Sequence, residues 1–281
     1  MLVQKLKVVQ HGYKALNTIL SSMSSASMIK VPLYLVSIIP VIYAWIKTGF
    51  KNPFLFALIV IFALASQLSM NIEMDLEDQK RGMKCFESEP LLNVGPCHVI
   101  LFKQNHLNII RKASLAAMLI IAVVVLAFTR MLVLLLYGLA GIVLMYAYLK
   151  KPFELYKRGL GEVSTFFDFG PILVLGSYIA LGGVYLNSVL IPSLGFGLIA
   201  SSIRYSHHIV EEVEGSRRKR FYPYAHALLL VLSSLTALNL LKAAFLIPVA
   251  LLVSVYASRH RLKTWADLLY LLYFSAISLL Y

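Results

Sequence analysis

The chain has 281 residues, of which 59% are hydrophobic and only 14% are charged. Soluble domains carry about 25% charged residues, so this composition excludes a soluble globular protein and indicates a membrane protein. A formal net charge of +13 is compatible with nucleic acid as a partner, but the basic residues lie between apolar runs, which argues against it.

Residues 1–30 are basic and carry apolar side chains at three- and four-residue spacings, a pattern typical of an amphipathic helix. These side chains are Leu2, Leu6, Val9, Tyr13, Leu16 and Leu20. We expect this helix to rest on the inner membrane surface. No compact apolar core precedes a small-residue cleavage site, so no cleavable signal is predicted. The chain then divides into this surface segment and a membrane domain, residues 31–281.

Nine apolar runs follow, and each approaches the ~20 residues that a helix needs to cross a membrane. They are Val31–Ile46, Pro53–Met70, Ala113–Thr129, Met131–Leu149, Val163–Leu181, Leu186–Ile203, Tyr222–Leu240, Ala243–Ala257 and Leu268–Tyr281. The sequence therefore predicts an all-α, polytopic membrane protein with nine transmembrane helices in one bundle.

The basic residues predict the orientation of this bundle in the cell membrane. With the N-terminus in the cytoplasm, every Lys and Arg falls on the inside except Lys47, Lys51, Arg130 and Lys242. This is the asymmetry of the positive-inside rule. The acidic residues lie on or near the same face, so we expect the active site on the cytoplasmic side.

The second run ends in an acidic stretch, residues 71–82. On a helix that turns ~100° per residue, Asn71, Asp75 and Asp78 share one face. Ionised oxygens at the end of an apolar helix are unfavourable unless cations meet them, and hard oxygen ligands of this kind suit Mg²⁺. A solvated acidic loop without a metal is the alternative interpretation.

A loop of roughly thirty residues, 78–108, follows; loops of this length are uncommon unless functional, so we expect a lid over the acids. It contains both cysteines, Cys85 and Cys97. A reducing cytoplasm disfavours a disulfide between them. Their spacing with His98 and His106 matches no recognised zinc site.

After the fourth run, residues 150–162 combine four basic residues with Tyr156 and two glycines. The basic residues are either anchors at the inner membrane face or part of an anion site, since glycines let backbone amides approach an anion closely. After the sixth run, His207, Glu211 and Glu214 repeat the spacing of the first acidic stretch. Two such helix ends on one face can converge on a shared cation; a loop without function is the alternative.

These parts together fit a ligand with a multiply charged head and a long apolar tail, an isoprenyl diphosphate. Mg²⁺ bridges carboxylates and diphosphate, and basic side chains neutralise the remaining charge. Loss of the diphosphate leaves an allylic cation, which an aromatic acceptor attacks inside an apolar pocket that excludes water.

The chain resembles the UbiA superfamily of intramembrane prenyltransferases, in particular the branch that prenylates 1,4-dihydroxy-2-naphthoate in menaquinone synthesis. The resemblance rests on residues 151–162, on residues 169–178, on the spacing of Asn71 and Asp75, and on the first run, where Lys30 stands in place of a usual arginine. It implies a nine-helix bundle with two aspartate-rich motifs and Mg²⁺-dependent transfer of a polyprenyl group to a quinone precursor.

The chain departs from this family in both motifs. Gln79 stands where the first motif usually has a further aspartate. The second motif contains no aspartate, and its polar residues are His208, Glu211, Glu212, Glu214 and Ser216. Since octahedral Mg²⁺ tolerates little misplacement of its ligands, either the site is rebuilt around glutamates or the chain has diverged in activity.

The expected roles follow from this reading. The candidate Mg²⁺ ligands are Asn71, Asp75, Asp78, Glu211, Glu212 and Glu214, among which Asp75, Asp78, Glu211 and Glu214 are the catalytic candidates. The candidate diphosphate-binding residues are Lys30, Arg81, Lys151, Tyr156 and Arg158. Glu162 and Asp168 are candidates to orient the acceptor.

Three other classes remain open. The chain transfers the prenyl group to a glycerol-phosphate lipid or another acceptor, or it is a diverged non-catalytic paralogue that acts as a binding or scaffold protein. A cation-coupled transporter is disfavoured because it needs acids near the bilayer midplane. The expected partners are isoprenyl diphosphate, an aromatic acceptor and membrane lipid, with neither nucleic acid nor an obligate protein partner.

Overall fold

The computed structural model describes residues 30–156, 158–211, 216–237 and 239–280. The amphipathic helix predicted for residues 1–30 lies outside this description, apart from Lys30. Within it the secondary structure is helical except for one short hairpin, which confirms the predicted all-α class.

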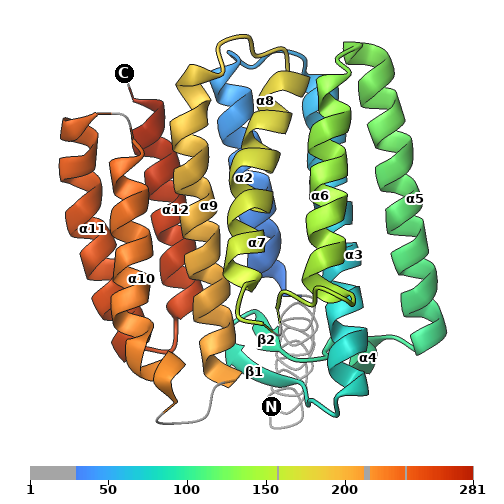
Figure 1. The fold of residues 1–281 in the computed structure, drawn as a ribbon, viewed down its shortest axis with the longest axis vertical. Coiled ribbons are helices and arrows are strands. Elements are labelled where there is room, and N and C mark those ends of the chain that lie inside the picture. The colour runs from blue at the N-terminus through green and yellow to red at the C-terminus, as the bar shows by residue number, and fades with distance from the viewer. Residues whose placement is uncertain (1–29, 157, 212–215, 238, 281) are drawn as a thin grey trace, which may run out of the picture.

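The helices run side by side along the long axis of the molecule and form one bundle (Figure 1). In chain order they are α2 (Val31–Lys47), α3 (Pro53–Lys80), α5 (Gln104–Thr129), α6 (Val133–Leu149), a rod made of α7 (Gly161–Phe167), the π-helix η1 (Asp168–Leu175) and α8 (Gly176–Ala180), then α9 (Asn187–His208), α10 (Arg217–Leu235), α11 (Leu240–Arg259) and α12 (Lys263–Leu279). These helices overlap the predicted runs, although α3, α5 and α10 extend into polar sequence at the end of the bundle that carries the site.

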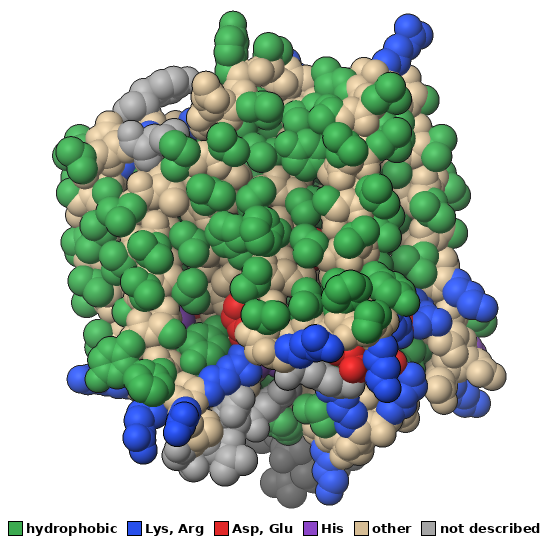
Figure 2. Space-filling model, viewed as in Figure 1, with side chains coloured by type: hydrophobic (Ala, Val, Ile, Leu, Met, Phe, Trp, Pro, Cys, Tyr) green, Lys and Arg blue, Asp and Glu red, His purple; other side chains and the backbone are tan. Residues whose placement is uncertain are grey.

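Five of these helices are long and apolar enough to cross a membrane: α3, α5, the α7–η1–α8 rod, α9 and α11. Large apolar side chains on α5 are exposed on the outside of the bundle, and those of Ile109, Ile120 and Phe128 are 63–64% exposed. Hydrophobic side chains cover the middle of the molecule, while Lys and Arg gather mainly at its lower end (Figure 2). The chain is therefore an integral membrane protein.

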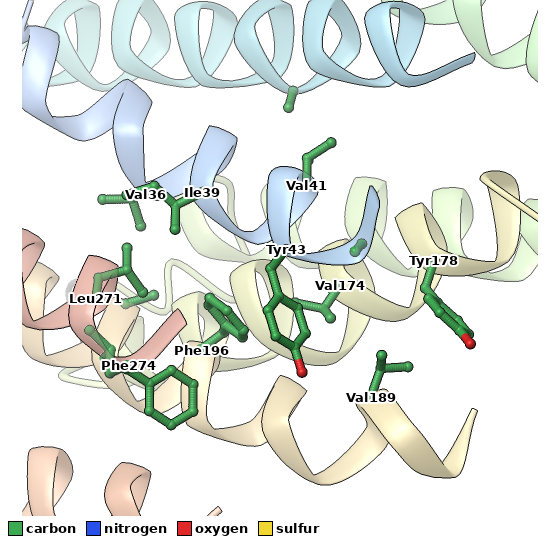
Figure 3. Close-up of a cluster of buried hydrophobic side chains, with 14 of the residues drawn as sticks. Val36, Ile39, Val41, Tyr43, Val174, Tyr178, Val189, Phe196, Leu271 and Phe274 are labelled. Carbon is green, nitrogen blue, oxygen red and sulfur yellow. The ribbon is translucent and has the colours of Figure 1, made fainter. Parts of the chain in front are cut away.

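Helix α9 is the central element, and 72% of its most apolar stretch is buried inside the bundle. The ring of Phe196 lies 4.8 Å from that of Tyr43 on α2 and 5.3 Å from that of Phe274 on α12, measured between centroids (Figure 3). Glycines bring η1 close to α9: a Cβ on Gly170 would lie 2.6 Å from the Ser193 carbonyl oxygen. Small residues allow this close approach between apolar helices.

The loop between α3 and α5 folds into a hairpin of β1 (Phe86–Glu89) and β2 (Leu92–Val94), followed by the short helix α4 (His98–Leu101). We call residues 82–103 the hairpin loop. Cys85 and Cys97 form a disulfide across its base, with their Cα atoms 5.0 Å apart. The prediction that these cysteines form no disulfide was therefore wrong. It rested on the cellular compartment alone, whereas antiparallel pairing of the strands brings the flanking residues together.

The far end of the hairpin loop is attached to α12. The buried carboxylate of Glu89 accepts hydrogen bonds from the backbone amides of Thr264, at 2.9 and 3.1 Å, and Trp265, at 3.4 Å. The Trp265 indole donates to the Pro90 carbonyl at 2.7 Å. An acid at a helix N-terminus satisfies amides that have no partner within the helix, so the loop ties the end of α3 to the start of α12.

Candidate prenyl-transfer site

A cavity of about 600 Å³ lies among α2, α3, α5, α6, the α7–η1–α8 rod and α9. Most of its wall is apolar, with Phe62, Val125 and Ile172 among the lining side chains. Polar side chains line the same cavity from the helix ends near the hairpin loop. They are Lys30, Asn71, Tyr148, Arg204, His207 and His208. Such a cavity suits a ligand with a polar head and a long apolar body.

Asp75, the central acid of the first motif, is completely buried and fully paired. Its Oδ1 accepts from Lys30 Nζ at 2.6 Å. Its Oδ2 accepts from the His98 backbone amide at 2.7 Å and lies 2.8 Å from His98 Nδ1. The hairpin loop and the start of α2 thus meet on one carboxylate of α3, as a buried charge requires.

Asn71, one helical turn before Asp75, faces the cavity in a short chain of side-chain hydrogen bonds. Its Oδ1 accepts from Gln67 Nε2 at 3.0 Å, and Gln67 Oε1 accepts from the Ser37 hydroxyl at 3.1 Å. Its Nδ2 is buried and has no hydrogen-bond partner within the described residues. A buried donor without a partner beside a cavity indicates a place for a ligand or water.

A second face of α3 binds the neighbouring helices through ion pairs. Glu73 pairs with Arg111 of α5 and with Lys150, which follows α6, and Glu77 lies 3.5 Å from Lys150. Burial disfavours the charged form of Lys150, but its hydrogen bond to Glu73 and the charges of both glutamates outweigh this and raise its pKa. Lys150 therefore holds the acidic end of α3 against the loop after α6.

The other first-motif and loop residues lie nearer the surface. Asp78 lies 3.7 Å from the Arg81 guanidinium, which stacks over the Tyr156 ring at 4.4 Å. Arg158 is exposed and donates to the Pro152 carbonyl at 2.6 Å. Lys151 is also exposed. Of the five predicted diphosphate-binding residues, Lys30 lines the cavity and the other four do not.

The end of α9 contributes polar side chains to the cavity. Arg204 is held by Glu162 of α7, at 2.6 Å, and by the Tyr148 hydroxyl, at 3.0 Å; Glu162 pairs with Arg218 as well. His207 is buried, and its Nδ1 has no partner among the residues described. A guanidinium fixed by two partners is positioned to bind an anion with little loss of side-chain freedom.

Only part of the second motif lies within the described residues. Glu211 closes the short helix η2 (Ile209–Glu211), but its side chain is outside the description, as are Glu212 and Glu214. In the described parts of the chain, no three His, Cys, Asp or Glu side chains come together to hold a metal ion. Both oxygens of Asp75 are occupied by Lys30 and His98, so the first motif in this arrangement does not fit Mg²⁺.

A comparison with characterised proteins finds 2-carboxy-1,4-naphthoquinone phytyltransferase from Synechocystis sp. (strain ATCC 27184 / PCC 6803 / Kazusa), which is 26% identical over 185 residues. The match covers 64% of this chain and 58% of the phytyltransferase, so it spans less than two thirds of that relative. No family model and no solved structure matches the chain. The similarity confirms the resemblance to the UbiA-type prenyltransferases.

Several residues of the cavity end were missed by sequence reasoning. Arg204 precedes His207 by three residues and His208 by four, so it shares their helix face, and this spacing could have identified it. Tyr148 lies at the end of an apolar run and has no comparable pattern. His98 reaches Asp75 only through the path of the hairpin loop, which no local pattern specifies.

Proposed function

We propose that this protein is a membrane-embedded prenyltransferase that transfers a polyprenyl group from an isoprenyl diphosphate to an aromatic quinone precursor. The observation that carries this proposal is the cavity, which has apolar walls and the cationic side chains of Lys30 and Arg204 at one end. The similarity to a phytyltransferase that acts on a naphthoquinone supports the same reaction class.

In this reaction the bond between the first prenyl carbon and the diphosphate oxygen breaks, and the diphosphate keeps the electron pair. Lys30 and Arg204 neutralise the charge that develops on the leaving diphosphate. The apolar wall shields the allylic cation from water. A carbon of the acceptor ring then forms the new carbon–carbon bond and releases its proton, which restores the aromatic ring.

Mg²⁺ is part of the proposal on the basis of the sequence motifs alone. Its ligands would come from Asn71, Asp75 and Asp78 on α3 and from the glutamates that follow α9, Glu211, Glu212 and Glu214. Bound there, the ion would supply positive charge to the diphosphate. Because Asp75 is already paired with Lys30 and His98, Mg²⁺ could reach it only if these partners moved.

We further propose that all nine helical rods cross the cell membrane, with the N-terminus and the polar end of the cavity in the cytoplasm. Two observations support this topology. Lys and Arg gather at the end of the bundle that carries the polar side chains (Figure 2), and basic loops remain on the cytoplasmic side. Helices α2 and α6 are apolar, although they are shorter than the five longest spans.

The direct test supplies purified full-length protein in lipid nanodiscs with geranylgeranyl diphosphate and 1,4-dihydroxy-2-naphthoate. Prenylated product is followed by mass spectrometry, and binding of a non-hydrolysable diphosphate analogue is measured with Mg²⁺ and with EDTA. We expect product, and binding that Mg²⁺ strengthens. Binding without this product would move the acceptor search to other aromatics and to glycerol-phosphate lipids. No binding in either condition would contradict the proposal and favour a non-catalytic paralogue.

A further inference from the structure

A disulfide closes the base of the hairpin loop at the basic end of the bundle. Cys85 comes five residues after Lys80, the last residue of α3, and Cys97 directly precedes His98. The hairpin lies at the lower end of the bundle (Figure 1), where Lys and Arg gather (Figure 2). In the proposed topology this end lies in the cytoplasm. Disulfides are rare in that compartment, and those that form there are usually transient, catalytic or redox-sensing.

The backbone at the base of the hairpin brings the two cysteines together. The antiparallel register sets Phe86, the neighbour of Cys85, opposite Val94. Gly95 follows with a φ of +86°, and an added Cβ there would lie 2.4 Å from the Lys84 carbonyl oxygen. Glycine permits this close approach at a positive φ. The thiols formed by reduction therefore stay close while the strands remain paired, and the disulfide can form again.

The two sulfurs differ in their access to solvent. The Cys97 side chain is buried, whereas Cys85 is partly exposed next to the exposed Lys84. A dithiol reductant therefore attacks the Cys85 sulfur, and Cys97 leaves as a thiolate. The second thiol of the reductant then closes its own disulfide and releases Cys85. Two electrons and two protons pass to the protein, and the reductant is oxidised.

The disulfide adjoins the contact that occupies Asp75. The backbone amide of His98 donates to Asp75 Oδ2 at 2.7 Å, and its Nδ1 lies 2.8 Å from the same oxygen. Through Cys85 and Cys97 this contact closes a ring of chain that starts and ends on α3. Because a cross-link restricts the open state more than the closed state, loss of the disulfide favours release of His98.

We propose that Cys85 and Cys97 form a reversible redox site that controls access to the polar end of the cavity. The structure, in which both Asp75 oxygens are occupied, is the oxidised state. Reduction releases His98 and frees Asp75 Oδ2, while Lys30 continues to hold Oδ1. As regulation of the candidate site, this inference rests on the proposed function, but the movement of His98 is measured without any ligand.

The test measures hydrogen–deuterium exchange of the full-length protein in lipid nanodiscs, oxidised and after treatment with dithiothreitol at the same pH. We expect exchange in residues 95–102 to become at least about tenfold faster on reduction, because a cross-link over a loop of this size favours the closed state by up to roughly 100-fold. The amide of Thr264 should not change, because Glu89 binds it at the far end of the hairpin loop. Reoxidation with diamide should restore slow exchange.

A second readout follows the carboxyl of Asp75 itself. Labelling with a carbodiimide and glycine amide, read by mass spectrometry, should modify Asp75 only in the reduced protein. Asp267 is equally buried and is paired with His226, so it is the internal control and should stay unlabelled in both states.

Two variants separate the disulfide from other effects of the reductant. Cys85→Ser combined with Cys97→Ser should exchange and label like the reduced wild type in both conditions. Glu87→Gln changes an exposed acid of the same loop but keeps the disulfide, so it should respond like the wild type. If the double variant does not fold, reduction and reoxidation of the wild type answer the same question.

The outcomes distinguish this inference from the proposed function. Equal exchange in residues 95–102 and equal labelling of Asp75 in the two redox states would overturn the inference, even if a diphosphate analogue binds. A redox-dependent change, combined with no binding of the analogue in either state, would support the movement of His98 and contradict the proposed function.

Discussion

Acidic side chains at the polar end of the cavity differ from the acid inside it in whether they form ion pairs. At the polar end, each described carboxylate that holds the helices together has fixed cationic partners: Asp75 has Lys30, Glu73 has Arg111 and Lys150, and Glu162 has Arg204 and Arg218. Inside the cavity, Asp168 has no partner within the described chain. The carboxylates at the polar end are paired within the protein, whereas Asp168 faces the cavity without such a partner among the described residues.

The paired carboxylates stabilise the structure around the site, whereas Asp168 is available to bind a substrate. Removing one partner of a buried pair leaves the other charge uncompensated and destabilises the fold. Removing a carboxyl that has no partner among the described residues should leave the fold intact and affect only ligand binding. Measurements of stability, as well as of activity, can therefore test whether the paired carboxylates and Asp168 have different roles.

The largest effect is expected at Asp75. Asp75→Asn leaves Lys30 as a buried cation without its counter-ion and weakens the attachment of His98. We expect a loss of about 3–5 kcal/mol of stability, seen as a lower thermal midpoint in detergent, together with loss of diphosphate binding.

A paired variant separates the two consequences at Asp75. Combining Asp75→Leu with Lys30→Met removes both buried charges, and apolar replacements of a buried pair are often neutral for stability. The double variant should therefore regain much of the thermal midpoint without regaining diphosphate binding. If Asp75→Asn alone has the thermal midpoint of the wild type, the ion pair between Lys30 and Asp75 does not stabilise the fold.

The next effect concerns ligand affinity rather than stability. Arg204→Gln removes the fixed guanidinium at the polar end but leaves Glu162 paired with Arg218. We expect binding of the diphosphate analogue to weaken by about 10- to 100-fold, as for the loss of a charge-assisted hydrogen bond, with little change in the binding of the aromatic acceptor. Arg158→Gln is the control, because Arg158 is exposed and does not line the cavity. Equal losses in both variants would place the diphosphate at the surface loop instead.

A smaller effect is expected where the hairpin loop meets α12. Burial raises the pKa of Glu89, although its backbone hydrogen bond with Thr264 opposes this. A carboxyl whose pKa is raised by folding stabilises the folded state below its ordinary value of 4.5, and this contribution is lost as the pH rises through the raised value. The attachment should therefore be tightest in acid and weaken upward from about pH 4.5.

Trp265 reports on this contact directly, because it donates to Pro90 in the hairpin loop. In a Trp45→Phe background, its fluorescence should change with pH in the wild type. Glu89→Gln keeps a neutral acceptor for the amides and should remove the pH dependence, with a loss of stability of about 1 kcal/mol or less. A variant that titrates like the wild type would assign the change to another group.

The helices were predictable because apolar runs determine where membrane helices form, and residues such as Asn71, Asp75 and Lys30 were predictable from spacing and resemblance. The contacts of Asp75 were not. His98 reaches it through a hairpin whose path depends on the Cys85–Cys97 disulfide and on Glu89, a residue that meets α12 across 175 positions of sequence. Local periodicity carries no information on such distant contacts.

The smallest effect on stability is expected at Asp168, and it tests most directly whether this acid differs from the paired acids. Asp168→Asn and Asp168→Leu both remove a carboxylate that has no described partner, so neither leaves an uncompensated charge behind. We expect the thermal midpoint to stay the same or to rise slightly, because residues kept for function are often poor choices for stability, while binding of the aromatic acceptor weakens. Ser202 and Ser206 hold Asp267 in a paired network with His226, so Asp267→Asn is the matched control and should lower the midpoint. If the Asp168 variants destabilise the protein as much as this control, Asp168 is a structural acid like Asp75, and the contrast between the two ends of the cavity disappears.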